Sequence, residues 1–184
     1  MEILNNLCHL WSIAFYGIFG RFNYPLSMNC IIRKAEKKDV PAILGLIKEL
    51  AEFEKSPQEV KVTVDELERD GFGPDAVYKA FVAEAEGKIV GMALFYVKYS
   101  TWKGKAIYLD DIIVTEKYRR YKIGSKLFEA VIKVCKEMGV RKMDWQVLDW
   151  NTPAIEFYKK YNAVIADEWL NGSLHENHLK EINL

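Results

Sequence analysis

Three cations and two small residues stand directly before an apolar helical pattern. Arg119, Arg120 and Lys122 precede Gly124 and Ser125 in the stretch YRRYKIGS. The first turn of a helix presents free N–H groups and the positive end of its dipole, so cations are unfavourable there unless an anion binds between them. Glycine lets a ligand approach the backbone, and arginine makes bidentate phosphate contacts. The stretch therefore predicts a pyrophosphate site, with a solvated basic loop as the alternative.

The bulk composition describes one domain without a charge bias. The chain has 184 residues, enough for one domain with a real core. Lys and Arg together number 26, as do Asp and Glu. Because nucleic-acid binding usually needs a basic excess, we expect no nucleic-acid partner. The three cysteines share no C-x-x-C spacing, which favours a reducing compartment, and the three histidines lack supporting cysteines, so we expect no metal.

Residues 1–27 differ from the rest of the chain. The apolar run Leu7–Gly20 is shorter than the about 20 residues that a membrane span needs, and no basic segment or A-x-A-like cleavage site accompanies it. Met28 begins a segment that reads like a fresh N-terminus. We therefore expect an N-terminal extension over 1–27, outside a domain over 28–184, and no membrane span. A membrane anchor is the alternative for the extension.

Hydrophobic periodicity predicts alternating strands and helices after residue 28. The predicted strands cover residues 30–35, 78–85, 89–99, 106–114, 141–149 and 163–174, and the predicted helices cover 37–55, 64–70, 123–138 and 151–162, with a short helix in the tail. The order β-α-α-β-β-β-α-β-α-β(-β) indicates an α/β or α+β domain with a mixed sheet, in which 106–114 and 141–149 are parallel. Strict alternation along 106–114 places Asp110 and Asp111 on opposite faces.

Several separated motifs resemble those of the GNAT superfamily of acetyl-CoA-dependent N-acetyltransferases. In the signature [RQ]-x-x-G-x-[GA], Arg119 or Arg120 supplies the first position and Gly124 the last, while Lys122 stands where the middle glycine is usual. The stretches LIKELAEFEK, DGFG, YSTWKGK, YLDDIIV and LDWNTPAIEFYKK look like the spermidine/spermine acetyltransferase family, nearest to its diamine or thialysine branch. The resemblance covers about residues 29–174.

The resemblance implies a fold, a reaction and a set of contacts. The fold is a GNAT-type mixed, mostly antiparallel sheet flanked by helices, and the reaction is acetyl transfer from acetyl-CoA to a primary amine of a small molecule. The implied acetyl-CoA contacts are Ile112, Ile113, Val114, Arg119, Arg120, Tyr121, Lys122, Ile123, Gly124, Ser125, Asn151 and Tyr158. The resemblance also implies a homodimer, and the cysteine usage favours a cytoplasmic location.

The same resemblance assigns chemical roles. Tyr158 would protonate the coenzyme A sulfur, and Asp110 would accept the amine proton, more readily through water because Asp is shorter than the usual Glu. Phe53, Glu54 and Trp102, together with Asp110, would contact the amine. Each role has a structural alternative: a tyrosine packed in the core, a strand carboxylate paired with lysine, or a solvated helix residue.

The acceptor can be narrowed by counting charges. Ser100 stands where polyamine enzymes usually carry an acid, so fewer charge-assisted contacts await a polycation. We expect small mono- or diamines and lysine-like amino acids to be preferred. A protein acetyltransferase acting on N-termini or lysines, and a non-catalytic acetyl-CoA-binding module, are the alternatives. Coenzyme A titration with and without amine turnover separates the module from the enzymes.

Overall fold

A computed structural model of the chain describes residues 28–168 and 170–182. Contacts within the chain divide it into two compact units, the second of which begins at Trp145. The predicted extension over residues 1–27 lies outside the described residues. No described helix is both long and apolar enough to cross a membrane.

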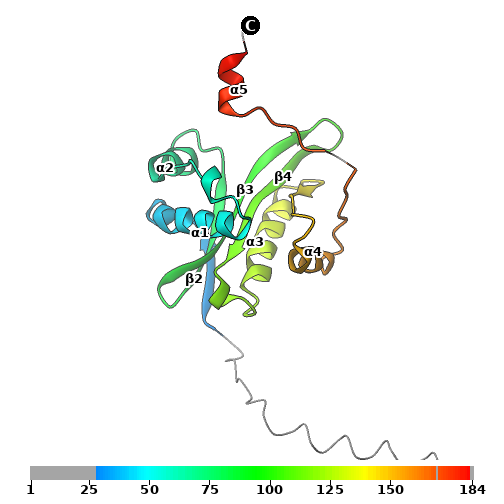
Figure 1. The fold of residues 1–184 in the computed structure, drawn as a ribbon. Coiled ribbons are helices and arrows are strands. Elements are labelled where there is room, and N and C mark those ends of the chain that lie inside the picture. Colours follow the sequence, from blue (N-terminus) through cyan, green and yellow to red (C-terminus); the bar gives the residue numbers. More distant parts are fainter. Residues whose placement is uncertain (1–27, 169, 183–184) are drawn as a thin grey trace, which may run out of the picture. The chain divides into compact units, whose positions relative to one another are not determined.

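The first unit is built on a five-stranded sheet in the order β1-β2-β3-β4-β5 (Figure 1). Neighbouring strands from β1 to β4 are antiparallel, and β5 alone is parallel to its neighbour β4. The strands are β1 (Cys30–Lys34), β2 (Lys79–Ala85), β3 (Lys88–Ser100), β4 (Gly104–Val114) and β5 (Met143–Asp144). The predicted mixed, mostly antiparallel sheet is confirmed, although β5 is much shorter than the predicted strand over 141–149.

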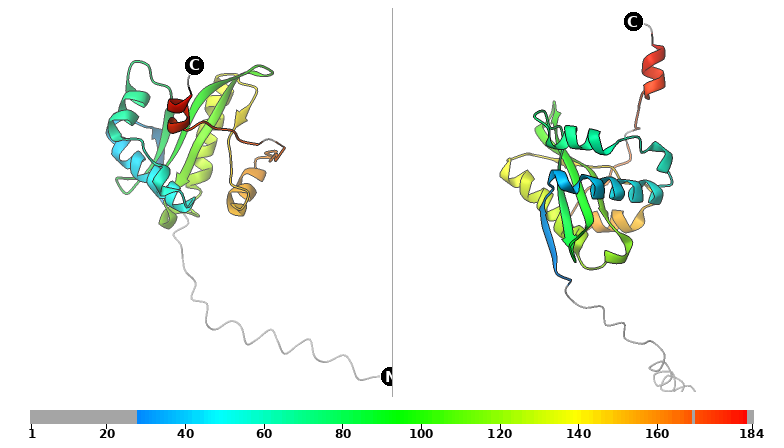
Figure 2. Two further views of the ribbon diagram at one scale, coloured as in Figure 1. Left: turned by 45° about the horizontal axis from the view of Figure 1, so that its top comes forward. Right: turned by 90° about the vertical axis from the view of Figure 1, so that its left-hand side faces the viewer.

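Helices cover both faces of this sheet (Figure 2). The helices are α1 (Val40–Phe53), α2 (Val64–Phe72) and α3 (Ile123–Glu137), with single 3-10 turns at Lys37–Asp39, Pro57–Glu59 and Glu116–Tyr118. Side chains of α1 and α2 pack against one face of the sheet and form two clusters with it. One cluster contains Ile43, Leu46, Val82, Met92 and Ile113. The other contains Val40, Leu67, Tyr78, Ala80 and Leu94. Because side chains alternate along strands, Phe81 and Phe95 stack on the opposite face, which α3 covers.

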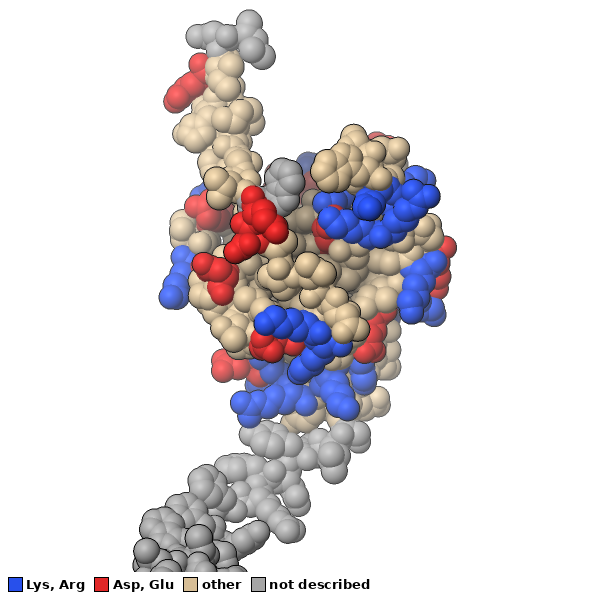
Figure 3. Space-filling view, turned by 90° about the vertical axis from the view of Figure 1, so that its right-hand side faces the viewer, with Lys and Arg blue, Asp and Glu red and all other residues tan. Residues whose placement is uncertain are grey.

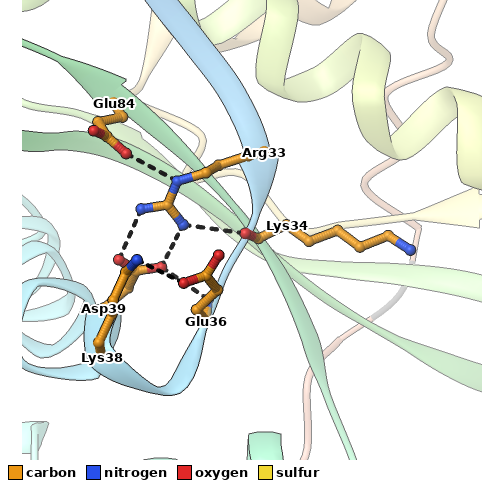
Figure 4. A network of polar contacts seen from close by, with 6 residues as sticks. All are labelled: Arg33, Lys34, Glu36, Lys38, Asp39 and Glu84. Carbon is orange, nitrogen blue, oxygen red and sulfur yellow. Dashed lines mark hydrogen bonds and ion pairs between the residues drawn. The ribbon is translucent and has the colours of Figure 1, made fainter.

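Arg33 in β1 ties the edge strand to β2 and to the start of α1 (Figure 4). Its Nη1 donates to Asp39 Oδ2 at 2.6 Å, and its Nε donates to Glu84 Oε2 at 2.9 Å. Asp39 is only 4% exposed, and its carboxylate also accepts the Glu36 N–H at 2.8 Å. The hydrogen bond from Arg33 holds the pKa of Asp39 below its usual value despite burial. Asp39 therefore stabilises the entry to α1 through Arg33 rather than by capping the helix.

The second unit contains two helices and, within its described residues, no strand. The helices are α4 (Thr152–Lys159) and α5 (Glu176–Glu181). Asn151 caps α4, because its Oδ1 accepts the Ala154 N–H at 3.3 Å. The predicted strand over 163–174 was wrong for the residues described there. Alternating apolar residues form a strand only where a neighbouring strand satisfies the backbone, and the residues described in this unit offer none.

Candidate active site

A β-bulge in the middle of β4 sets two carboxylates side by side. Asp111 pairs with Leu94, whereas Leu109 pairs with the next β3 residue, Phe95, so Asp110 is an extra residue without a partner of its own. The bulge turns Asp110 toward the face that Asp111 shares with Leu94, and both carboxylates line one cavity. The prediction that Asp111 lies on the opposite face was wrong, because strict alternation does not hold across a bulge.

The cavity is an open pocket of about 470 Å³ on the α1 and α2 face of the sheet. Its polar lining consists of Asp110 and Asp111 from β4, Tyr96 from β3, and Asp70 and Tyr78 from α2 and the segment after it. The apolar lining is Ile47, Val62, Leu67, Val77 and Leu94. A chamber with apolar walls and a few carboxylates suits a ligand with a hydrocarbon body and positive ends.

Burial and like charge perturb the carboxylates of this site. Burial, together with the negative charges of Asp110 and Glu54, raises the pKa of Asp111 to about 7. Burial also raises the pKa of Asp110 and that of Glu54 above their ordinary values. Glu54, at the end of α1, is thus close enough to act on Asp111. A carboxyl group with a pKa near 7 exchanges protons readily at neutral pH.

Arg119 connects the end of α1, at Phe53, with the end of β4, at Val114. Its guanidinium carbon lies 5.6 Å from the centre of the Phe53 ring, and its Nε donates to the carbonyl oxygen of Val114 at 3.0 Å. Phe53 and Glu54 were both predicted to contact the amine, and Arg119 was predicted to hold a phosphate. The contact with Phe53 shows that these two predicted groups of residues meet within the first unit.

The start of α3 has the features of an anion site. Lys122 is the N-cap residue, makes no side-chain capping bond, and has a left-handed backbone with φ of 59°, which explains why a glycine is usual there. The first helical turn holds no acidic residue. A Cβ added at Gly124 would have only Val114 Cγ2 nearby, at 3.9 Å. The protein itself therefore leaves space beside Gly124, and no side chain caps the N–H groups of the first turn, which can bind an anion.

The edge of β4 that precedes this helix has no paired strand over its second half within the described sheet. Within the described sheet, β5 pairs only with Ile107 and Tyr108, so no strand covers that edge of β4 from Leu109 to Val114. Backbone groups of the predicted segment Ile112–Val114 lie on this stretch. An extended ligand can therefore hydrogen-bond to β4 in place of a strand, with its anionic end at α3.

Three predicted site residues are not among the residues of the first unit that line the cavity. Trp102 is 83% exposed in the turn between β3 and β4 and does not line the carboxylate cavity. Ser100 Oγ accepts the N–H groups of Trp102 and Lys103 at 3.3 and 3.2 Å, so this hydroxyl shapes the turn. Asn151 and Tyr158 belong to the second unit, where the Tyr158 ring lies 4.7 Å from that of Trp145. The described residues contain no group of three or more His, Cys, Asp or Glu able to hold a metal.

An uncapped helix start preceded by basic residues is the feature that the sequence resemblance implied, whereas the bulge and the unpaired edge of β4 come from the structure alone. The acetyltransferase (GNAT) family model matches residues 44–163, and the chain belongs to this family of acetyltransferases. The thialysine N-ε-acetyltransferase of Bos taurus is 43% identical over 141 residues, which cover 72% of this chain and 83% of that protein. Its Mus musculus counterpart is 37% identical over 162 residues, covering 82% and 95%.

Other relatives extend the comparison. The Homo sapiens spermidine/spermine N(1)-acetyltransferase-like protein 1 is 35% identical over 140 residues, which cover 72% of this chain and 20% of that protein. Among solved structures, the aminoglycoside N-acetyltransferase AAC(6')-Iy in complex with CoA has a TM-score of 0.65 at 19% identity, covering 82% of this chain and 97% of that chain. At this identity the structural likeness shows the fold.

Gly124→Ala is expected to stabilise the protein while weakening its binding of acetyl-CoA. Alanine in place of a helical glycine raises the free energy of unfolding by about 0.5–1 kcal/mol, and Cβ has space in the ligand-free protein. The same Cβ would obstruct a phosphate at the helix start, so we expect the KM for acetyl-CoA to rise about tenfold, the equivalent of one lost hydrogen bond. Thermal unfolding and initial-rate kinetics measure the two effects.

Gly45→Ala in α1 is the matched control, since Cβ there meets nothing within 4 Å. It should stabilise the fold similarly and leave the KM for acetyl-CoA unaltered. An unchanged KM in Gly124→Ala as well would rule out a phosphate at this glycine.

Proposed function

We propose that this acetyltransferase moves the acetyl group of acetyl-CoA to a primary amine of a small molecule. The observation that carries the proposal is the pair Asp110 and Asp111, held by the bulge in an apolar cavity. Paired carboxylates favour an ammonium group, and the pKa of about 7 at Asp111 suits a group that accepts a proton at neutral pH. The relatives named as thialysine N-ε-acetyltransferases support the same substrate class.

The acceptor must lose a proton before it can react, because an alkylammonium has a pKa of about 10. In the proposed reaction, Asp110 and Asp111 hold the ammonium group, and one of them takes its proton directly or through water. The neutral nitrogen then attacks the thioester carbonyl, so that a C–N bond forms, the C–S bond breaks and the nitrogen releases a second proton to solvent. The carboxyl group later releases its proton to solvent.

Other residues would stabilise the remaining charges. Backbone N–H groups of Ile112–Val114 would bind the developing oxyanion, and Arg119–Ser125 would bind the pyrophosphate. Tyr158 would give its hydroxyl proton to the departing sulfur and recover one from solvent. These roles rest on the family pattern together with the open β4 edge and the uncapped start of α3.

A panel of amines tests the proposal. Pure protein, acetyl-CoA and single amines (thialysine, lysine, short diamines, spermidine and spermine) should give acetylated products detectable by mass spectrometry, with the highest kcat/KM for small acceptors. A preference for spermine of tenfold or more would contradict the charge count at Ser100. Binding of coenzyme A without turnover of any amine, free or in a peptide, would point to a non-catalytic module.

The pH dependence of the reaction should follow Asp111. We expect kcat/KM to rise with pH around an apparent pKa near 7, as Asp111 becomes able to accept a proton. Because its pKa is higher in the folded than in the unfolded chain, ionisation of Asp111 opposes folding, and stability should fall as pH rises from about 4 to 7.

Two amines of different pKa should give rate profiles with the same apparent pKa, since that pKa belongs to the enzyme. Asp111→Asn should lose both the rise of kcat/KM with pH and the fall of stability with pH. A stability slope that persists in Asp111→Asn would contradict the assignment.

Two further proposals follow from the family pattern. We expect a homodimer, which sedimentation velocity would test, since a monomer at micromolar concentration would contradict it. We also expect a cytoplasmic location, in keeping with the few cysteines and their spacing. Imaging of the tagged full chain would test it.

A further inference from the structure

The cavity that Asp110 and Asp111 line contains a third carboxylate, which comes from a different element. Asp70, in the last turn of α2, lines the same cavity as Asp110 and Asp111 on β4. The rest of the lining is mainly apolar, and it includes Leu67 and Leu94. The cavity lining therefore carries carboxylates from two different elements together with apolar side chains.

Local packing fixes the position of Asp70. The Tyr78 hydroxyl donates to the carbonyl oxygen of Leu67 at 2.7 Å, which holds the segment after α2 against the helix. Gly71 makes room for the Tyr78 ring, because a Cβ there would lie 2.3 Å from the ring Cζ. The end of α2 thus cannot shift without displacing a buried tyrosine. Asp70 is a built part of the cavity wall.

The charge of Asp70 is already shared with a neighbour. Arg69 Nε and Nη2 donate to the two carboxylate oxygens of Asp70 at 2.7 and 3.1 Å. The Asp70 side chain is 39% exposed and that of Arg69 is 67% exposed, so water screens this pair strongly. The carboxylate of Asp70 can therefore accept a further hydrogen bond from a ligand. A cationic ligand would compete with Arg69 for the two carboxylate oxygens.

We propose that Asp70 binds a second ammonium group of the acceptor and so favours acceptors with two separated positive charges. The inference rests on the proposed function and narrows its substrate class to diamines and lysine-like amino acids. The reacting amine would lie at Asp110 and Asp111, its methylene chain along the apolar wall, and the distal ammonium at Asp70. Arg69 would weaken this selectivity, because it competes with the distal ammonium.

The test compares cadaverine with pentylamine, which share a five-carbon chain and differ in one ammonium group. The ratio of their kcat/KM values reports recognition of the distal charge. Asp70→Asn should lower this ratio about five- to tenfold, as expected for one partly exposed charge-assisted contact. Arg69→Gln should raise it, because it removes the competing cation. Asp75→Asn makes the same charge change at an exposed turn residue outside the cavity lining and should leave the ratio as it is.

Opposite changes in the two variants cannot come from a general loss of folding. An unaltered ratio in Asp70→Asn, or parallel losses for both amines, would overturn the assignment of Asp70 while leaving the acetylation of amines intact. If no variant acetylates any amine, calorimetric binding of cadaverine separates the outcomes. Weaker cadaverine binding in Asp70→Asn alone would then support the Asp70 site and reject the proposed reaction.

Discussion

Tyr158→Phe is expected to keep its fold and to lose about 10²–10⁴-fold in kcat, the usual contribution of a general acid. Tyr158 is 5% exposed, and its ring packs 4.7 Å from Trp145 and 5.2 Å from Phe157. Phenylalanine retains these ring contacts and removes only the hydroxyl. A loss of turnover without a large loss of stability would therefore report chemistry at the oxygen. Steady-state kinetics and thermal unfolding measure both quantities.

Tyr161→Phe is the matched control, because Tyr161 belongs to the same unit and packs against the same Phe157 ring, at 5.5 Å. We expect it to retain most of its turnover. If Tyr158→Phe is as active as the wild type across the pH range, Tyr158 is a packing residue.

Arg33→Leu is expected to lower the free energy of unfolding by about 3 kcal/mol, because it leaves the buried Asp39 carboxylate without its partner. The effect should depend on pH. The pKa of Asp39 is lowered in the folded protein, so the pair stabilises the fold above pH of about 4 and this contribution is lost as pH falls. The difference between wild type and variant should shrink in acid. Urea unfolding at several pH values measures it.

Two variants make this prediction specific. Adding Asp39→Asn to Arg33→Leu removes the stranded charge and should recover part of the loss. Lys133→Met breaks only the exposed pair with Glu137, whose charged atoms are 3.9 Å apart, and should change stability by less than about 0.5 kcal/mol. If Arg33→Leu and Lys133→Met lowered the free energy of unfolding equally, burial of Asp39 would contribute little to the cost of losing its partner.

The elements of the first unit could be read from the sequence because local signals mark them. Pro41 lies in the first turn of α1, Gly139 ends α3 with φ of 62°, and Glu86-Gly87 connects β2 to β3, as the patterns indicate. The failures are strands whose pairing depends on distant residues. Residues 141–149 reduce to β5, and residues 163–174 show no strand where they are described, because an apolar alternation cannot specify a partner.

The site was predictable where it follows the chain and not where it depends on register. The basic stretch before Gly124 predicts an anion site at the start of α3 directly from residue types, and the structure has a helix start there without a side-chain cap. Asp111 was expected on the face opposite Asp110, because nothing in the sequence reveals the bulge at Asp110. Two successive acids inside an apolar strand were the available signal. Asp70 belongs to the stretch DGFG, but nothing there indicates a cavity, because only the fold brings this residue to one lining with residues of β3 and β4.

The backbone at the start of α3 has a consequence for selection. Arg120 and Lys122 both have positive φ, at 71° and 59°, and Gly124 weakens the first turn of the helix. Each of these positions could be made more favourable by a single substitution that does not disturb the core. Laboratory evolution for heat tolerance alone should therefore enrich changes at these positions. The surviving variants should gain thermal stability and lose catalytic turnover together. Selection that alternates heat with turnover should leave Gly124 untouched and improve other helices instead.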